Sequence, residues 1–405
     1  MFLSRSVGSW TTVRIATSIA FFAQLQFYVP LITPFLQARG LDLAQIALLQ
    51  SVVLWTQFVL EVPTGVIADR IGRRWSVTLA LVAQLCGQTL FLLAHDYWTF
   101  VLAQVITGTG FAFASGSVDA LVFESLPVVD RTARMQQAKG QIGTAVQAAS
   151  LIAWVAGPIF AMDLSLTRIA LAIALAIIAT GIACVTSLAL REPRVARGSA
   201  TPHSLTLLRD GIGLFRRNPR LRRISLAYIL TNAFIAHLLV FYQAYFVQTG
   251  VPGIWLGLAL GFGSLLGLLG QRYAHLLVRG PAQHHGLVVA TALPGILYLA
   301  MAVNRHPTLA VLLFCLQWGT IQISAPLFAG YLNEHIPDES RATALSLLNA
   351  MLSAYVGLVG LLVGIVATTS LPTSFALMGL LVLAGVVAFR LDERHLGEPT
   401  GSMHS

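Results

Sequence analysis

Long apolar runs separated by short polar stretches make up most of the chain. Most of these runs are near the length of about 20 residues that an α-helix needs to cross the hydrocarbon core of a bilayer. They do not show the strict apolar and polar alternation of a membrane β-strand. We therefore predict twelve membrane-spanning helices, at residues 12–36, 43–68, 76–94, 98–123, 138–161, 168–190, 224–247, 253–277, 286–303, 308–332, 342–366 and 372–390.

The composition agrees with this pattern. Hydrophobic residues make up 56% of the chain and charged residues only 10%, whereas a soluble domain carries about 25% charged residues. Each of the three cysteines, Cys86, Cys184 and Cys315, lies inside an apolar run without a close partner, so neither a disulfide nor a thiolate metal site is predicted. The predicted fold class is an all-α membrane protein.

The net charge of +9 could in principle indicate nucleic-acid binding, but the distribution of the basic residues argues against it. Only Arg39, Arg168 and Arg305 fall in loops on one side, which leaves 22 of the 25 basic residues for the other side. Because cytoplasmic loops carry the excess of Lys and Arg, we expect both termini to be cytoplasmic. The first apolar run is too long for a cleavable signal peptide. A multi-pass protein of the inner or plasma membrane is expected.

A hydrophilic segment at residues 191–223, with nine arginines, divides the chain nearly in two. We interpret it as a cytoplasmic linker between a bundle of six helices at residues 1–190 and a second at residues 224–405. A weak internal repeat supports two related halves, because Glu, Pro and Arg recur at the same spacing in residues 124–131 and 334–341.

The loop after the second predicted helix carries the most specific motif. Residues 65–74 read Gly-Val-Ile-Ala-Asp-Arg-Ile-Gly-Arg-Arg. This segment, called the motif loop below, closely resembles the signature G-x-x-x-D-R-x-G-R-R/K of the major facilitator superfamily. The helix count, the linker and the repeat extend the resemblance over the whole chain. It implies two pseudo-symmetric six-helix bundles around a central cavity, with alternating access, and it is closest to the drug and metabolite efflux type.

The motif loop predicts a cytoplasmic gate. Gly65 permits close helix approach and Gly72 a tight turn. The resemblance implies that Asp69 meets the N-terminus of the helix at residues 342–366 and that Arg73 pairs with Glu124. A carboxylate is stabilised at such a helix end. The alternative interpretation is an ordinary cluster of charges that anchors the loop at the membrane surface.

Two acids lie inside apolar runs. Glu61 belongs to a polar stripe with Gln57, and Asp119 follows Ser115 by one helical turn. An ionised carboxylate at membrane depth costs about 2.5 kcal/mol or more. We therefore predict Glu61 and Asp119 as proton-coupling candidates. The alternative for Glu61 is a structural hydrogen bond between helices.

The resemblance also implies that the first, fourth, seventh and tenth helices line the substrate cavity. A lone histidine such as His237 is more often an interior residue with satisfied hydrogen bonds than a proton carrier. The candidate cavity residues are Gln24, Tyr28, Gln57, Ser115, Asn232, His237, Tyr242, Gln243, Trp318 and Gln322.

The fifth predicted helix contains Gly157 and Pro158, which resemble the glycine-proline motif of the family's antiporters. Ala153 and Ala161 stand where that motif has glycine, so the direction of transport is left open. The alternative is a proline kink packed against a neighbouring helix.

These features predict a secondary active transporter, with export of a hydrophobic or amphiphilic small molecule in exchange for protons. The chain has no phosphate-binding glycine-rich loop followed by Lys-Ser or Lys-Thr, so ATP is not the expected energy source. A proton-driven uptake symporter is the first alternative. A remote alternative is an intramembrane enzyme that uses His275, His284 and His285, although these residues lack the spacing of a His-Glu-x-x-His site.

We expect the protein to be a monomer in contact with membrane lipids, with no cofactor, metal or nucleic acid.

Overall fold

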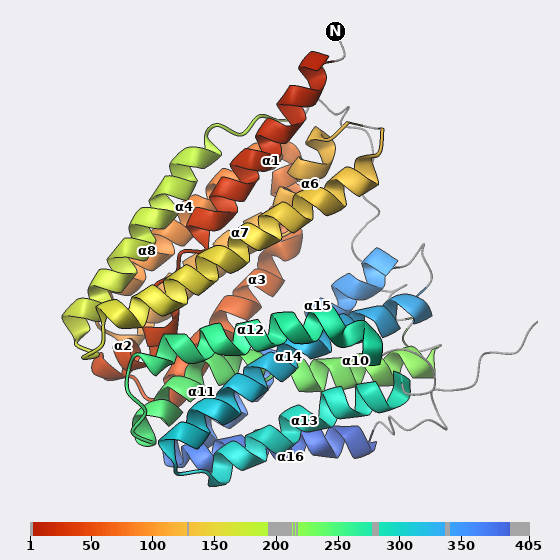
Figure 1. Cartoon of the computed structure of the whole chain (residues 1–405). Coiled ribbons are helices and arrows are strands. Elements are labelled where there is room, and N and C mark those ends of the chain that lie inside the picture. Colours follow the sequence, from red (N-terminus) through yellow and green to blue (C-terminus); the bar gives the residue numbers. More distant parts are fainter. Residues whose placement is uncertain are drawn as a thin grey trace, which may run out of the picture. The chain divides into compact units, whose positions relative to one another are not determined.

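The computed structural model describes residues 3–127, 129–192, 213, 215, 218–277, 283–336 and 341–388 (Figure 1). These residues form helices joined by turns and short loops, without a strand among them. The chain divides into two compact units, Met1–Ala200 and Thr201–Ser405. Their boundary falls inside the segment interpreted from the sequence as a linker. The predicted all-α class is confirmed.

The first unit contains six apolar segments in the order predicted. Two of them consist of more than one helix. The helices are α1 (Leu3–Ala23), the short 3-10 helix η1 (Val29–Leu31), α2 (Ile32–Ala38), α3 (Leu43–Ile71), α4 (Arg73–Leu93), α5 (Tyr97–Ala114), α6 (Ser117–Ser125), α7 (Arg131–Phe160) and α8 (Leu166–Ser187).

The second unit likewise contains six apolar segments, one of them divided. Its helices are α10 (Pro219–Asn232), α11 (Ile235–Gln248), α12 (Trp255–Leu277), α13 (Gln283–Val303), α14 (Pro307–His335), α15 (Arg341–Thr369) and α16 (Leu371–Ala388). Across the described residues of both units, 9 helical segments are long and apolar enough to cross a membrane. Every one of the twelve predicted runs coincides with one helix or one divided segment.

Three of the predicted continuous helices are interrupted, which corrects the sequence interpretation of residues 12–36, 98–123 and 224–247. Residues 24–28 are not helical, and the chain resumes at Val29 with the 3-10 helix η1, which has Pro30 near its start. Gly116 has a φ of 71°, a left-handed conformation that ends α5. Between α10 and α11 neither glycine nor proline is present, so no local signal in the sequence marks this break.

Small residues allow the helices of each unit to approach closely. In the first unit, a Cβ on Gly108 of α5 would lie 2.7 Å from the Val53 carbonyl oxygen of α3. In the second unit, a Cβ on Gly267 of α12 would lie 2.5 Å from Cβ of Gln322 on α14. These glycines set the distance between paired helices, and larger side chains at the same positions would separate them.

Acidic residues in two loops of the first unit cap the helices that follow. Asp42 accepts a hydrogen bond from the Gln45 N–H at 2.8 Å, and the Gln45 side chain accepts one from the Asp42 N–H. Asp96 accepts from the Thr99 hydroxyl and N–H, which lowers the pKa of Asp96. These caps define where α3 and α5 begin.

Candidate functional site

The break between α5 and α6 places a hydroxyl group beside the embedded acid of α3. Because Gly116 turns the chain, Ser115 projects from the end of α5, and its Oγ donates a hydrogen bond of 3.2 Å to Glu61 Oε1. Both residues are exposed within the first unit. In the part of the chain that the structure describes, Ser115 is the hydrogen-bond partner of Glu61, and no cation pairs with it.

Asp119, the second embedded acid, has a different environment. Its Oδ2 lies 2.9 Å from Nζ of Lys139 on α7, with exposed fractions of 59% and 57% for the two side chains. Lys139 is the only lysine of the chain. Sequence reasoning missed this contact because Lys139 is 20 residues away from Asp119 along the chain. The two acids therefore differ, since Glu61 meets a neutral hydroxyl and Asp119 a cation.

The motif loop makes a tight turn between α3 and α4. Gly72 has a φ of 102°, which a residue with a side chain rarely adopts. Across this turn Arg73 Nη2 lies 2.7 Å from Asp69 Oδ1. The turn thereby brings together two of the residues assigned to the gate.

A residue that the sequence analysis did not select, Glu192, completes the motif loop. Its carboxylate accepts hydrogen bonds of 2.8 Å from the backbone N–H groups of both Arg73 and Arg74. These are unsatisfied donors at the N-terminus of α4, whose N-cap, Gly72, has no side chain to accept them. A Cβ on Gly72 would also lie 2.8 Å from the Glu192 carboxylate. The position therefore needs glycine both for its φ and for the space it leaves.

Arg74 makes the reciprocal contact. Its Nη2 donates a hydrogen bond of 2.9 Å to the Leu188 carbonyl oxygen at the C-terminus of α8, and its guanidinium lies 5.0 Å from the Trp75 ring centroid. The start of α4 and the end of α8 are thus each capped by a charged side chain from the other segment. We call this pair of contacts, made by Glu192 and Arg74, the α4–α8 clasp.

The remaining gate candidates make fewer contacts. Arg73 pairs with Asp69, and no ion pair joins it to Glu124 among the described residues. Glu124 is partly buried near the end of α6. No described atom lies within 4 Å of the position that a Cβ on Gly65 would take. Arg341 begins α15, and Pro337 before it lies outside the described residues, as does its neighbour Asp338.

Two candidate cavity residues of the first unit, Gln24 and Tyr28, lie in the break after α1. Gln24 and Tyr28 belong to the non-helical residues and are partly buried, as is Gln57 on α3. Gly157 of α7 packs directly against this break, because a Cβ at this position would collide with the Phe27 carbonyl oxygen. The glycine of the antiporter-like pair thus lies where the backbone of the interrupted helix passes.

Most of the cavity candidates in the second unit are packed inside that unit. The Tyr242 hydroxyl donates to the Leu256 carbonyl oxygen at 2.8 Å, and its ring stacks on Phe314 with centroids 4.2 Å apart. Trp318 Nε1 donates to Ser264 Oγ at 3.0 Å. Gln322 is partly buried. The buried candidates are Asn232, His237, Tyr242, Gln243 and Trp318.

The side chains of His275, His284 and His285 lie outside the described residues, as do residues 193–212 of the predicted linker. Within the described residues there is no group of three or more His, Cys, Asp or Glu side chains that could hold a metal ion.

Comparison with known proteins gives three results. Residues 15–314 match the sequence pattern of the Major Facilitator Superfamily. The inner membrane transport protein YajR of Escherichia coli (strain K12) is 29% identical over 156 residues, or 38% of this chain. The aligned part spans 33% of the length of YajR, so about a third of that relative is matched.

Solved structures of transporters share the fold. The nucleoside transporter NupG superposes with a TM-score of 0.72 at 14% identity, covering 93% of this chain and 98% of that one. A POT family transporter in complex with 5-aminolevulinic acid has a TM-score of 0.74 at 12% identity, covering 95% and 96%. A bacterial homolog of the human lysosomal transporter Spinster has a TM-score of 0.68 at 17% identity, covering 96% of each chain.

Proposed function

Because the chain belongs to the Major Facilitator Superfamily, we propose that it exports a hydrophobic or amphiphilic small molecule in exchange for protons. Membership makes the protein a multi-pass membrane protein and a secondary transporter, and it excludes the enzyme considered from the sequence. The substrate class, the direction and the coupling ion are the parts that we propose.

The environment of Glu61 is the observation that carries the proposal. An acid that takes up and releases a proton during transport must be stable in both the charged and the neutral form. A hydroxyl partner suits this role, because Ser115 Oγ can donate to a carboxylate and can accept from a carboxylic acid. Asp119 instead already forms an ion pair with Lys139, at 2.9 Å. We therefore assign the coupling proton to Glu61.

The other residues assigned from the sequence enter the proposal as follows. Both termini and residues 191–223 are cytoplasmic, and the motif loop with Asp69 and Arg73 gates the cytoplasmic end of the transport path in a monomeric protein. The cavity candidates are mostly amides and aromatic residues, with one serine and one histidine, and they include no cluster of charges for a highly charged substrate. This composition favours a drug-like or natural-product substrate.

Dye transport by proteoliposomes tests the assignment. With an imposed pH gradient, the wild-type protein should move an amphiphilic fluorescent dye against the dye gradient. Glu61→Gln should abolish this gradient-driven transport and retain exchange of dye between the two sides, because Gln still fits the site but cannot carry a proton.

The matched control is Asp163→Asn, which removes a loop acid outside the proposed site and should transport as the wild type does. Proton-driven transport by Glu61→Gln at the rate of this control would refute the assignment. Movement of dye and protons in the same direction would favour the alternative, a proton-driven uptake symporter.

A further inference from the structure

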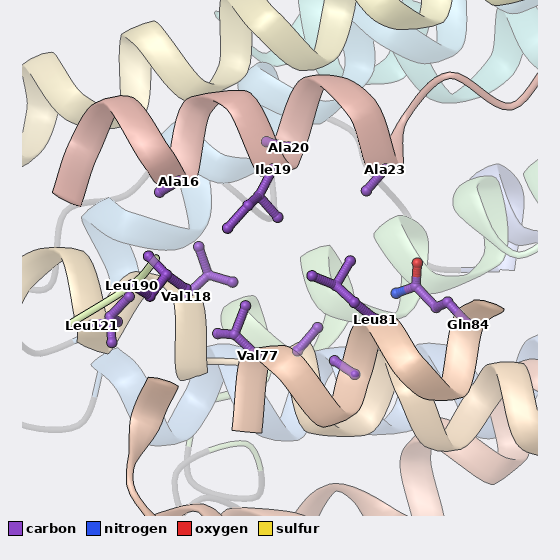
Figure 2. A pocket seen from close by; sticks show the side chains of 12 residues that line it. Ala16, Ile19, Ala20, Ala23, Val77, Leu81, Gln84, Val118, Leu121 and Leu190 are labelled. Atoms are coloured by element: carbon purple, nitrogen blue, oxygen red, sulfur yellow. The ribbon is translucent and has the colours of Figure 1, made fainter. Parts of the chain in front are cut away.

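The first unit contains a partly open cavity of about 140 Å³, and none of the candidate site residues lines it. Figure 2 shows α1 on one side of it, with Ala16, Ile19 and Ala23 directed toward Val77 and Leu81 of α4 on the other. Residues of α5 and α6, and Leu190 shortly after α8, complete the wall. The lining residues are Ala16, Ile19, Ala20, Ala23, Val77, Ala80, Leu81, Gln84, Ala114, Val118, Leu121 and Leu190.

The wall is apolar except at one end. At that end Gln84 directs its amide toward the cavity beside Ala23, and both residues are partly exposed. No other described residue forms a hydrogen bond with the Gln84 side chain. At the opposite end Leu121 and Leu190 are buried. The cavity therefore has a polar side chain at one end and apolar side chains at the other, which is the arrangement that an amphiphilic group needs.

The volume limits what can enter. An apolar cavity of about 150 Å³ stays dry and takes up benzene, whereas drug-sized molecules occupy pockets of about 300–1,000 Å³. From Ala16 to Ala23 the wall of α1 extends roughly 10 Å, at about 1.5 Å per residue. The cavity thus matches one ring or one short chain rather than a whole drug-like molecule.

The cavity adjoins the proposed proton site. Ala114 lines it, and the next residue, Ser115, donates to Glu61. Val118 lines it as well, and the next residue, Asp119, pairs with Lys139. An occupant of the cavity would therefore contact the end of α5 and the start of α6, the short segment that carries Asp119 and Ser115, the hydrogen-bond partner of Glu61.

We propose that this cavity binds the apolar end of the transported molecule, a group about the size of a phenyl ring, with Gln84 binding a hydroxyl or amide next to that ring. The proposal rests on the proposed function for the statement that the molecule is transported. The binding site itself is independent of the coupling ion, because its wall contains no ionisable residue.

Fluorine NMR with 4-fluorobenzyl alcohol tests the site in the purified full-length chain, with protein-free micelles as the blank. The wild type should broaden the probe signal in a saturable way, and the transported dye should displace the probe. Ala20→Leu fills the cavity from its partly exposed rim and should weaken binding several-fold. Ala83→Leu, a matched change on α4 outside the cavity, should bind the probe as the wild type does.

A second variant separates the two ends of the site. Gln84→Leu should weaken binding of 4-fluorobenzyl alcohol but not of fluorobenzene, which has no hydroxyl group. Equal binding by Ala20→Leu and Ala83→Leu, or failure of the dye to displace the probe, would overturn the proposal. Since no pH gradient is applied, this result does not depend on whether transport is driven by protons.

Discussion

At the scale of single residues, the two embedded acids of the first unit are distinguished by their partners. Glu61 accepts a hydrogen bond from Ser115, and Asp119 lies 2.9 Å from the ammonium group of Lys139. Both acids were selected from the sequence for the same reason, the energetic cost of a charge in an apolar helix. This reason does not indicate which of the two carries the coupling proton. The missing information was the fold of α6 against α7, which places Lys139 beside Asp119.

A rescue experiment tests this distinction. Asp119→Asn should slow gradient-driven dye transport, because it leaves Lys139 without the counter-charge that lies 2.9 Å away. Adding Lys139→Met removes that charge and should restore most of the rate. The same second change should not rescue Glu61→Gln. If Asp119→Asn with Lys139→Met stays inactive in the proteoliposome assay, Asp119 has a role of its own in proton transfer.

At the scale of elements, the sequence predicted where the helices lie but not where they break. Hydropathy is continuous through Gln24 and Ser115, so an apolar run gives little indication of an interruption. Glycine is also common in uninterrupted membrane helices, which is why Gly116 was not recognised as a turn. The turn at Gly116 accompanies a contact of Ser115 with α3, and such long-range contacts cannot be seen in a local pattern.

The α4–α8 clasp is a second feature at this scale that the sequence did not reveal. Glu192 was included in the predicted linker, since it lies beside Arg191 in a charged stretch. Its two hydrogen bonds to the start of α4 show that Glu192 packs against the first unit and does not belong to the linker. The motif loop is thus held by the segment that follows α8 as well as by its own Asp69 and Arg73.

Removing the clasp should reduce stability. A cap that satisfies the N–H groups of a helix start contributes about 0.5–2 kcal/mol, so Glu192→Ala should lower the free energy of unfolding by about that amount. Unfolding of the detergent-solubilised protein by increasing SDS measures the change. The comparison variant is Glu124→Ala, whose carboxylate has no ion pair among the described residues. Equal losses in the two variants would show that the clasp adds nothing specific.

At the scale of the whole molecule, the twelve apolar segments and the family were predictable, because spanning length and the motif loop are properties of short stretches of sequence. Along the sequence, the boundary between the two units, Met1–Ala200 and Thr201–Ser405, falls within the predicted linker. Alternating access requires these units to move relative to each other, and proton coupling requires that the motion depend on the charge of Glu61. This dependence is the central claim about the molecule.

The most direct test measures the distance between the two units while the pH is changed. Spin labels at Gln136→Cys near the start of α7 and Arg222→Cys near the start of α10, in a variant without Cys86, Cys184 and Cys315, report on one end of each unit. In mildly acidic and mildly alkaline buffer the distance distribution should differ, and Glu61→Gln should give one distribution in both buffers. A distribution in Glu61→Gln that shifts with pH as it does in the protein with Glu61 intact would contradict the account.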